Sequence, residues 1–231
     1  MNNLEIFYQQ FITYGGYKDY IKGLSNTAII AVFGLLIGFL IGCLIAIVKI
    51  IPNKKSVVII ILEKICDGYV ALFRGTPMVV QLLLMHFALF PAMGLDISSV
   101  AEAVIIFGFN SGAYMAEILR GGINAVDQGQ MEAGRSLGFG FAETMIRIIL
   151  PQAIKNILPT LGNEFIALLK ETSVVSFIAV VDVTKSLQNI ADATYEYFVP
   201  YIVLALTYLI IVVGITQLIK IMERRLARNE R

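Results

Sequence analysis

The sequence predicts an all-α membrane protein that crosses the bilayer several times. Of its 231 residues, 58% are hydrophobic and only 15% are charged, and the mean hydropathy is +0.79. A soluble domain usually has about 25% charged and about 45–50% apolar residues. The excess apolar surface therefore needs lipid around it. The net charge of +1 provides no field that would attract nucleic acid.

Five stretches are long and apolar enough to cross a hydrocarbon core of about 30 Å, which takes about 20 residues. They lie at about 24–48, 57–90, 97–119, 153–181 and 199–221. In the first stretch Gly34, Gly38 and Gly42 are four residues apart and share one helical face. Small residues at this spacing let another helix approach closely, so we expect this face to pack against protein.

The second stretch is too long for one ordinary span and is interrupted at Arg74–Pro77. Two separate spans are disfavoured by Glu63, Lys64 and Asp67, because each charge in mid-membrane costs roughly 2.5–3.5 kcal/mol. Proline removes a backbone donor and often breaks a helix. We therefore expect one long, broken helix and five spans in total.

The lysine and arginine residues indicate the orientation. With five spans, most of them fall on the side that holds the C-terminus, and the opposite side holds only a few. The first group is Lys49, Lys54, Lys55, Arg120, Arg135, Arg147, Lys155, Lys220, Arg224, Arg225, Arg228 and Arg231, and the second is Lys18, Lys22 and Lys185. Cytoplasmic loops are enriched in these residues, so we expect the N-terminus outside and the C-terminus inside.

We expect a single membrane domain over residues 1–231 with one substantial cytoplasmic loop, at about 121–149. Residues 1–5 carry no basic segment of the kind that begins a removable signal peptide. In the loop, Glu132 and Arg135 are three apart and can face each other on a short helix. Ala133, Gly134 and Gly138 would give that helix a flat patch. Such a helix can dock into a partner protein, and a re-entrant or packing loop is the alternative.

Glu164 is the most informative charge, because it falls close to mid-membrane in the fourth span. Intramembrane ionisable residues face a polar cavity or pair with a group on another helix. Glu164 is therefore a candidate to line a translocation cavity and bind a cationic group. A structural pair, for example with Arg74, or a protonated buried carboxyl are the alternatives.

Weaker candidates lie in the second and third spans. Asn110 and Tyr114 are four apart on one helical face and, with Ser111, could hydrogen-bond a ligand. Asn and Ser also join helices to each other in membranes, so a structural role is equally open. Thr76, at the helix break, could expose backbone groups to a carboxylate, or the break could be a simple kink. His86 is expected to be a packed residue.

No catalytic motif in the sequence predicts an enzyme. The sequence has one histidine, no HExxH motif and no Gly-x-x-x-x-Gly-Lys-Ser/Thr loop for nucleotide phosphates. We expect no catalytic residues, no metal site and no cofactor, and an energy source in another chain or an ion gradient.

Two runs resemble a known motif. Glu132–Gly138, followed by Ile148–Ala153, is similar to the "EAA" loop of ABC importer permeases, with Gly134 in place of the second alanine. Three further runs resemble the polar amino acid branch of that family. They are Phe73–Pro77 with Gln81, Ser111–Gly122, and Asn163–Ile166 with Lys170, Thr172 and Ser173. The resemblance extends from about residue 23 to residue 218.

The resemblance implies the type I ABC importer permease fold in the cell (inner, cytoplasmic) membrane. Its implied partners are a cytoplasmic ABC ATPase, a second permease subunit in a homo- or heterodimer, and an extracellular or periplasmic solute-binding protein. The ATPase would grip the loop through Glu132, Ala133, Gly134, Arg135 and Gly138. The membrane subunits would then form the translocation path by alternating access.

The resemblance also bears on the cargo. In the family, a carboxylate beside the asparagine that matches Asn163 is more typical of permeases for arginine, histidine or lysine, and an amide there of permeases for glutamine. Glu164 therefore favours basic amino acids. A permease for glutamine or other polar amino acids is the alternative. A stand-alone ion-coupled secondary transporter is a further one, although such proteins often show inverted repeats that this chain lacks.

Overall fold

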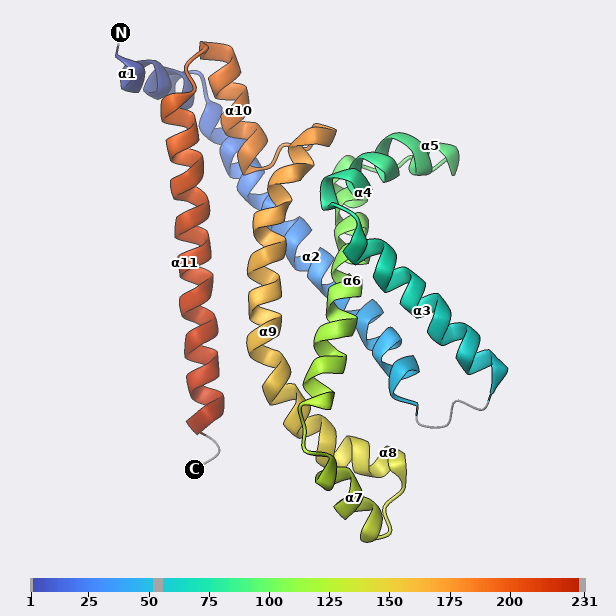
Figure 1. Ribbon diagram of the computed structural model, residues 1–231. Helices are drawn as coiled ribbons and strands as arrows, with labels where there is room; N and C mark the ends of the chain where they lie inside the picture. Colours follow the sequence, from blue (N-terminus) through green and yellow to red (C-terminus); the bar gives the residue numbers. More distant parts are fainter. Residues whose placement is uncertain (1, 52–55, 229–231) are drawn as a thin grey trace.

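The computed structural model describes residues 2–51 and 56–228, and every regular element within them is a helix (Figure 1). The all-α prediction is thereby confirmed. The elements of the first half are α1 (Asn3–Tyr8), the π-helix η1 (Gln9–Thr13), α2 (Gly16–Ile50), α3 (Val57–Gly75), α4 (Met78–Leu84), the π-helix η2 (Met85–Leu89) and α5 (Phe90–Ala92).

The second half begins with α6 (Ser99–Asn124), which packs against α2, α3 and α9. The remaining elements are α7 (Gln128–Ser136), α8 (Phe141–Thr144), the π-helix η3 (Met145–Ile149), α9 (Leu150–Glu171), the 3-10 helix η4 (Thr172–Ile178), α10 (Val183–Thr194) and α11 (Phe198–Arg228).

By length and hydropathy, two helices of the described chain qualify as membrane spans: Gly16–Ile50 and Phe198–Arg225. Five crossings remain a prediction. Figure 1 shows α7 and α8 at the end of the molecule where α11 ends, and the N-terminus at the opposite end. An odd number of crossings requires this arrangement. The charged residues Lys54, Lys55 and Arg231, used in predicting orientation, lie outside the described residues.

The predicted break in the second apolar stretch is confirmed. Helix α3 ends at Gly75, and Pro77 is the N-cap of α4, with extended backbone. Because proline disfavours helical backbone in the residue before it, Thr76 is also extended, at φ −122° and ψ 146°.

The predicted end of the fourth apolar stretch, at residue 181, is wrong. Helix α9 ends at Glu171 and continues as a short 3-10 helix. The hydroxyl of Thr172 donates to the carbonyl of Leu169, and that of Ser176 to the carbonyl of Ser173. Such local bonds compete with the α-helical ladder and favour tighter turns.

The glycine face predicted on the first span is confirmed as a helix contact. A Cβ added to Gly38 would lie 2.6 Å from the Cβ of Ser111 on α6, and one on Gly42 would lie 2.4 Å from the Cβ of Met115. Gly34 meets the same helix one turn earlier. Helices α2 and α6 therefore approach so closely that no side chain fits between them at these positions.

Helix α10 is fixed to the N-terminal part of α2. Asp182 is fully buried and caps α10 by accepting from the backbone N–H of Lys185 at 2.7 Å. Burial raises the pKa of the Asp182 carboxyl, and the backbone bond from Lys185 opposes that rise. The amide of Asn26 donates to the carbonyl of Val181 at 2.8 Å, so the turn before α10 is tied to α2.

We predict that Gly38→Ala lowers the unfolding free energy by about 1–3 kcal/mol, because the added methyl overpacks the α2–α6 contact. The cost should shrink in a Ser111→Gly background, which removes the opposing Cβ. Gly214→Ala is the control, since nothing lies within 4 Å of its added Cβ. Thermal unfolding of the detergent-solubilised protein measures all four variants. An equal cost of Gly38→Ala in both backgrounds would contradict the contact.

Candidate functional site

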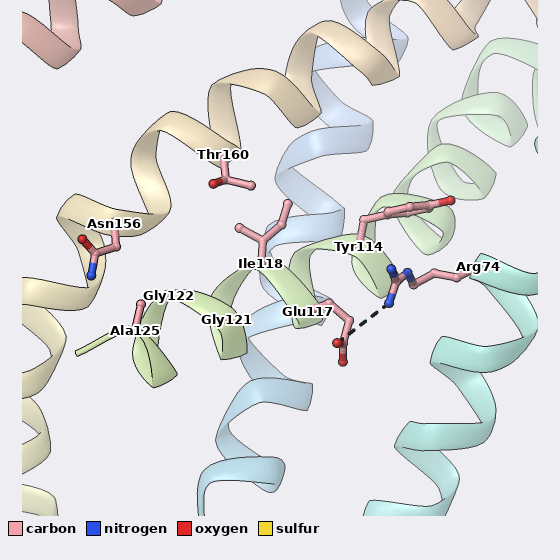
Figure 2. A pocket seen from close by; sticks show the side chains of 9 residues that line it. All are labelled: Arg74, Tyr114, Glu117, Ile118, Gly121, Gly122, Ala125, Asn156 and Thr160. Atoms are coloured by element: carbon pink, nitrogen blue, oxygen red, sulfur yellow. Dashed lines mark ion pairs between the residues drawn. The ribbon is translucent and has the colours of Figure 1, made fainter. Parts of the chain in front are cut away.

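A cavity of about 430 Å³ lies between α6, α9 and the end of α3. Figure 2 shows its lining, with polar side chains on all three helices. The residues that line it are Arg74, Tyr114, Glu117, Ile118, Gly121, Gly122, Ala125, Asn156 and Thr160. Of the substrate candidates predicted from the sequence, Tyr114 lies in this lining.

Arg74 provides a fixed cation at the edge of this cavity. Its guanidinium carbon lies 5.4 Å from the centroid of the Tyr114 ring, within the range of a cation–π contact. Its Nη1 lies 3.8 Å from a carboxylate oxygen of Glu117, and its side chain is 44% exposed (Figure 2). The planar guanidinium is thus held in place but keeps donors free for a ligand.

Glu117 does not neutralise Arg74, because it is shared among three cations. Its carboxylate lies 2.6 Å from Arg120 and 3.6 Å from Lys49, in addition to Arg74. Lys49 also pairs with Asp67 at 2.8 Å. This network joins α2, α3 and α6. The cavity edge therefore suits an anion such as a carboxylate.

One face of α9 carries polar residues toward the cavity. Asn156 and Thr160 line it and are four residues apart. Glu164 follows Thr160 at the same spacing, so it lies on the same face of the helix. Among the described residues, no hydrogen bond or ion pair holds the half-buried Glu164 carboxylate. Its charge lies within electrostatic range of Arg74 and Glu171. The structural pair with Arg74, considered as an alternative from the sequence, is therefore not formed.

The neighbouring Asn163 is exposed on α9. It is one residue away from the polar face and is not part of the cavity lining.

Thr76 and Asn110 belong to a hydrogen-bond network at the helix break. The amide nitrogen of Gln81 donates to the carbonyls of Phe73 and Thr76 and contacts the Thr76 hydroxyl, at 2.8–3.0 Å. Asn110 donates to the side-chain oxygen of Gln81 at 2.9 Å. These bonds satisfy backbone carbonyls that the break leaves without helical partners. Asn110 and Thr76 are thereby engaged in structure, which favours the simple kink over ligand-binding backbone.

Ser111 does not reach the cavity. It is fully buried against Gly38 in the α2–α6 contact. This position favours the structural role over contact with the substrate, because helix packing requires a small side chain there.

The predicted short helix in the cytoplasmic loop is α7. Glu132, Ala133 and Arg135 are exposed on it, as a docking surface needs. Glu132 and Arg135 share this short helix, but among the described residues no ion pair joins them. Gly134 is buried, and a Cβ there would lie 2.5 Å from Cγ2 of Thr144. Gly134 therefore packs α7 onto α8 instead of extending an exposed patch.

Gly138 ends α7. Its φ of +89° is in the left-handed region that favours glycine. Its N–H donates to the carbonyl of Arg135, and the N–H of Phe139 donates to that of Gly134. This pair of bonds is the Schellman motif, which satisfies the last carbonyls of a helix.

The family model for the binding-protein-dependent transport system inner membrane component matches residues 38–228. The chain belongs to this family. The permease, a multi-pass inner-membrane protein, is a subunit of an ABC importer of the polar amino acid type and a transport component rather than an enzyme.

Individual relatives match the permease over nearly its whole length. The arginine transport system permease protein ArtQ of Bacillus subtilis is 38% identical over 91% of this chain and 93% of its own. GlnP of Rickettsia bellii, whose name refers to a glutamine transport system, is 39% identical over 89% of this chain and 92% of its own.

Solved structures share the fold. A chain from the crystal structure of an amino acid ABC transporter with histidines is 40% identical, with a TM-score of 0.84 over 94% of this chain and 98% of that chain. A chain of the MetNI methionine ABC transporter, in an inward facing conformation, has a TM-score of 0.67 at 19% identity, over 90% of this chain and 94% of that chain. The type I importer permease fold is thereby confirmed.

Several cavity residues were not among the candidates from the sequence. Asn156 and Thr160 precede Glu164 at four-residue spacing, and this polar face could have been noticed in the fourth span. Arg74 was considered only as a structural partner. Its cation–π contact with Tyr114 joins residues far apart in the chain, which no local pattern reveals.

We predict that Gln81→Leu destabilises the permease by about 1–3 kcal/mol, because the carbonyls of Phe73 and Thr76 at the break lose their side-chain donor. The matched control is Gln217→Leu, at an exposed position on α11. Thermal unfolding of the purified protein provides the comparison. Equal unfolding midpoints for the two variants would show that the Gln81 bonds do not support the break.

Proposed function

We propose that the permease forms the translocation path of an ATP-driven importer for basic amino acids such as arginine, histidine or lysine. The observation that carries this proposal is the half-buried carboxylate of Glu164. It has no direct partner among the described residues and continues the polar face of α9 that lines the cavity. A charge kept at membrane depth without a partner is costly, and a cationic ligand would offset that cost.

The positive charge of Arg74 suits the α-carboxylate end of such a ligand. Arg74 is oriented by Tyr114 and shares Glu117 with two other cations, so it can bind the α-carboxylate that every amino acid carries. Glu164 would then attract the cationic side chain. Together, Arg74 and Glu164 would favour an amino acid whose side chain is positively charged.

The comparisons support this cargo in part. One relative bears the name of an arginine transport system, and one related structure is of an amino acid transporter with histidines. GlnP is similar at nearly the same identity, so glutamine or another polar amino acid is the competing cargo. An ion-coupled secondary transporter is disfavoured by family membership.

We further propose that α7 is the coupling helix that a cytoplasmic ATPase grips. Two permease subunits, in a homo- or heterodimer, would move together when the ATPase closes on ATP, and a solute-binding protein would deliver the amino acid from outside. The exposed Glu132, Ala133 and Arg135 provide the contact surface. Gly134 packs α7 against α8, and Gly138 ends α7, so these two glycines would support coupling by stabilising the helix and not by touching the ATPase.

We predict that Glu164→Gln weakens arginine binding by about tenfold to a hundredfold, since a hydrogen bond to a charged group contributes about 1.5–3 kcal/mol. Glutamine binding should change by less than about threefold, because its neutral amide forms no ion pair with the carboxylate and can donate a hydrogen bond to either side chain at position 164. Titration calorimetry on the permease–ATPase complex without its binding protein measures both ligands directly.

Glu223→Gln, which removes a carboxylate on the last turns of α11, is the matched control. Equal losses for arginine and glutamine would mean that Glu164 acts on folding or on the ammonium group alone. Unchanged arginine affinity would remove Glu164 from the binding site.

We predict that Glu132→Arg lowers the ATP-driven uptake rate by at least about tenfold, because reversing an exposed charge at a docked interface opposes association by several kcal/mol. The variant permease should still insert and unfold at the normal temperature, since the Glu132 side chain is exposed on α7. Uptake into vesicles and co-purification of the ATPase are the measurements. Gly138→Ala, which strains the left-handed turn, serves as a comparison that should also lower the unfolding temperature. Normal uptake by the Glu132→Arg variant would exclude α7 as the docking element.

A further inference from the structure

The N-terminal segment formed by α1 and η1 lies beside the first turns of α11 and runs across the direction of that helix (Figure 1). Helix α11 is one of the two described helices that are long and apolar enough to span a membrane. A segment that crosses its axis at its end therefore lies along the membrane surface and not through it.

One face of this segment is anchored on the protein. Phe7 and Phe11 stack with a centroid distance of 5.3 Å, and Phe11 meets the edge of Tyr20 at 5.6 Å. Both phenylalanines pack against a buried cluster that includes Leu187 and Ile190 of α10. Because α10 is itself tied to α2, the segment has a fixed position.

The face beside this anchor is apolar and exposed. Leu4, Tyr8 and Ile12 are four residues apart, and 63%, 62% and 46% of their surfaces are exposed. In a regular α-helix, residues four apart drift by about 40° around the axis. The wider π turn over Gln9–Thr13 reduces this drift and keeps the three side chains in one stripe.

The third face is polar. Glu5, Gln9 and Thr13 are exposed, and each follows one residue of the apolar stripe. Around the helix axis, the segment therefore presents a protein face, an apolar face and a polar face in turn. This order fits a helix at the boundary of protein, lipid and water.

Exposed aromatic side chains lie at the same end of the molecule as α1 and η1 (Figure 1). They are exposed at the turn before α2, in its first turn, in the turn before α11, and in the first turn of α11. They are Tyr14, Tyr17, Tyr195, Tyr197, Phe198 and Tyr201. Tyrosine is enriched where a membrane protein passes through the headgroup region. The apolar stripe therefore continues a surface that the aromatic residues already assign to the bilayer interface.

We propose that residues 3–13 form an interfacial anchor whose stripe of Leu4, Tyr8 and Ile12 inserts into the headgroup region of the leaflet on the N-terminal side. The charge asymmetry predicts that this is the outer leaflet. The anchor holds α10, and through it the N-terminal part of α2, at a constant depth.

The permease has no tryptophan, so one introduced tryptophan reports its own surroundings. The full-length chain with Tyr8→Trp is reconstituted at low density in phosphatidylcholine vesicles, with and without bromine atoms near the headgroup end of the acyl chains. Fluorescence quenching by bromine reports lipid contact, and quenching by aqueous iodide reports water contact. Gln9→Trp, one residue later on the polar face, is the matched control, and Leu209→Trp on the exposed side of α11 is the lipid reference.

The Tyr8→Trp variant should be quenched by brominated lipid at least about threefold more than the Gln9→Trp variant, with the opposite order for iodide. Ile12→Trp should match Tyr8→Trp and replaces it if that variant does not insert. The proposal is overturned if iodide quenches tryptophan at positions 8 and 9 equally. It is also overturned if neither quencher reaches position 8, or if its shielding appears only at high protein density or on adding another protein, since the stripe would then contact protein.

Discussion

The close contact of α2 with α6 is the constraint on which the other parts of the permease depend. Lipid tails are as apolar as the helices, so the hydrophobic effect does not drive these helices together in the bilayer. Close backbone approach is needed instead, and it requires Gly34, Gly38 and Gly42 on α2. Gly108 and Gly112 on α6 play the reciprocal part, because a Cβ on either would press against Ile37 or Ile41. Helix α6 is thereby fixed, and it carries Tyr114 and Glu117 into the cavity.

A second requirement follows from the bilayer, where each backbone polar group needs a partner within the protein. The break between α3 and α4 satisfies it through Gln81 and Asn110, and in doing so it holds the end of α3 in place. Arg74 is one residue before that end. The same break that interrupts the helix therefore positions the cation of the cavity, while the shared carboxylate of Glu117 leaves it able to bind an anion.

Much of the fold could be predicted from the sequence because the signals are local. The glycine spacing predicts the helix contact, Pro77 predicts the break, and the charged, small-residue run at 132–138 predicts α7. The orientations of single polar residues could not be predicted in this way. Ser111 and Tyr114 lie within one turn of each other, yet one packs against α2 and the other faces the cavity.

Contacts between distant residues account for the other differences. His86, expected to be a packed residue in an apolar run, contacts the carboxylate of the buried Glu102 on α6. Gly134, expected on an exposed patch, faces Thr144, which belongs to the next helix. In each case the partner lies on another element, so the sequence around the residue contains no signal of it.

The position of a bound amino acid tests the charge arrangement of the cavity most directly. An electron cryomicroscopy map of the assembled transporter with arginine would locate both ends of the ligand. The guanidinium should lie within ion-pair distance of Glu164, with the α-carboxylate toward Arg74. Arginine bound with its side chain away from Glu164, or outside the space between α3, α6 and α9, would contradict the proposed recognition.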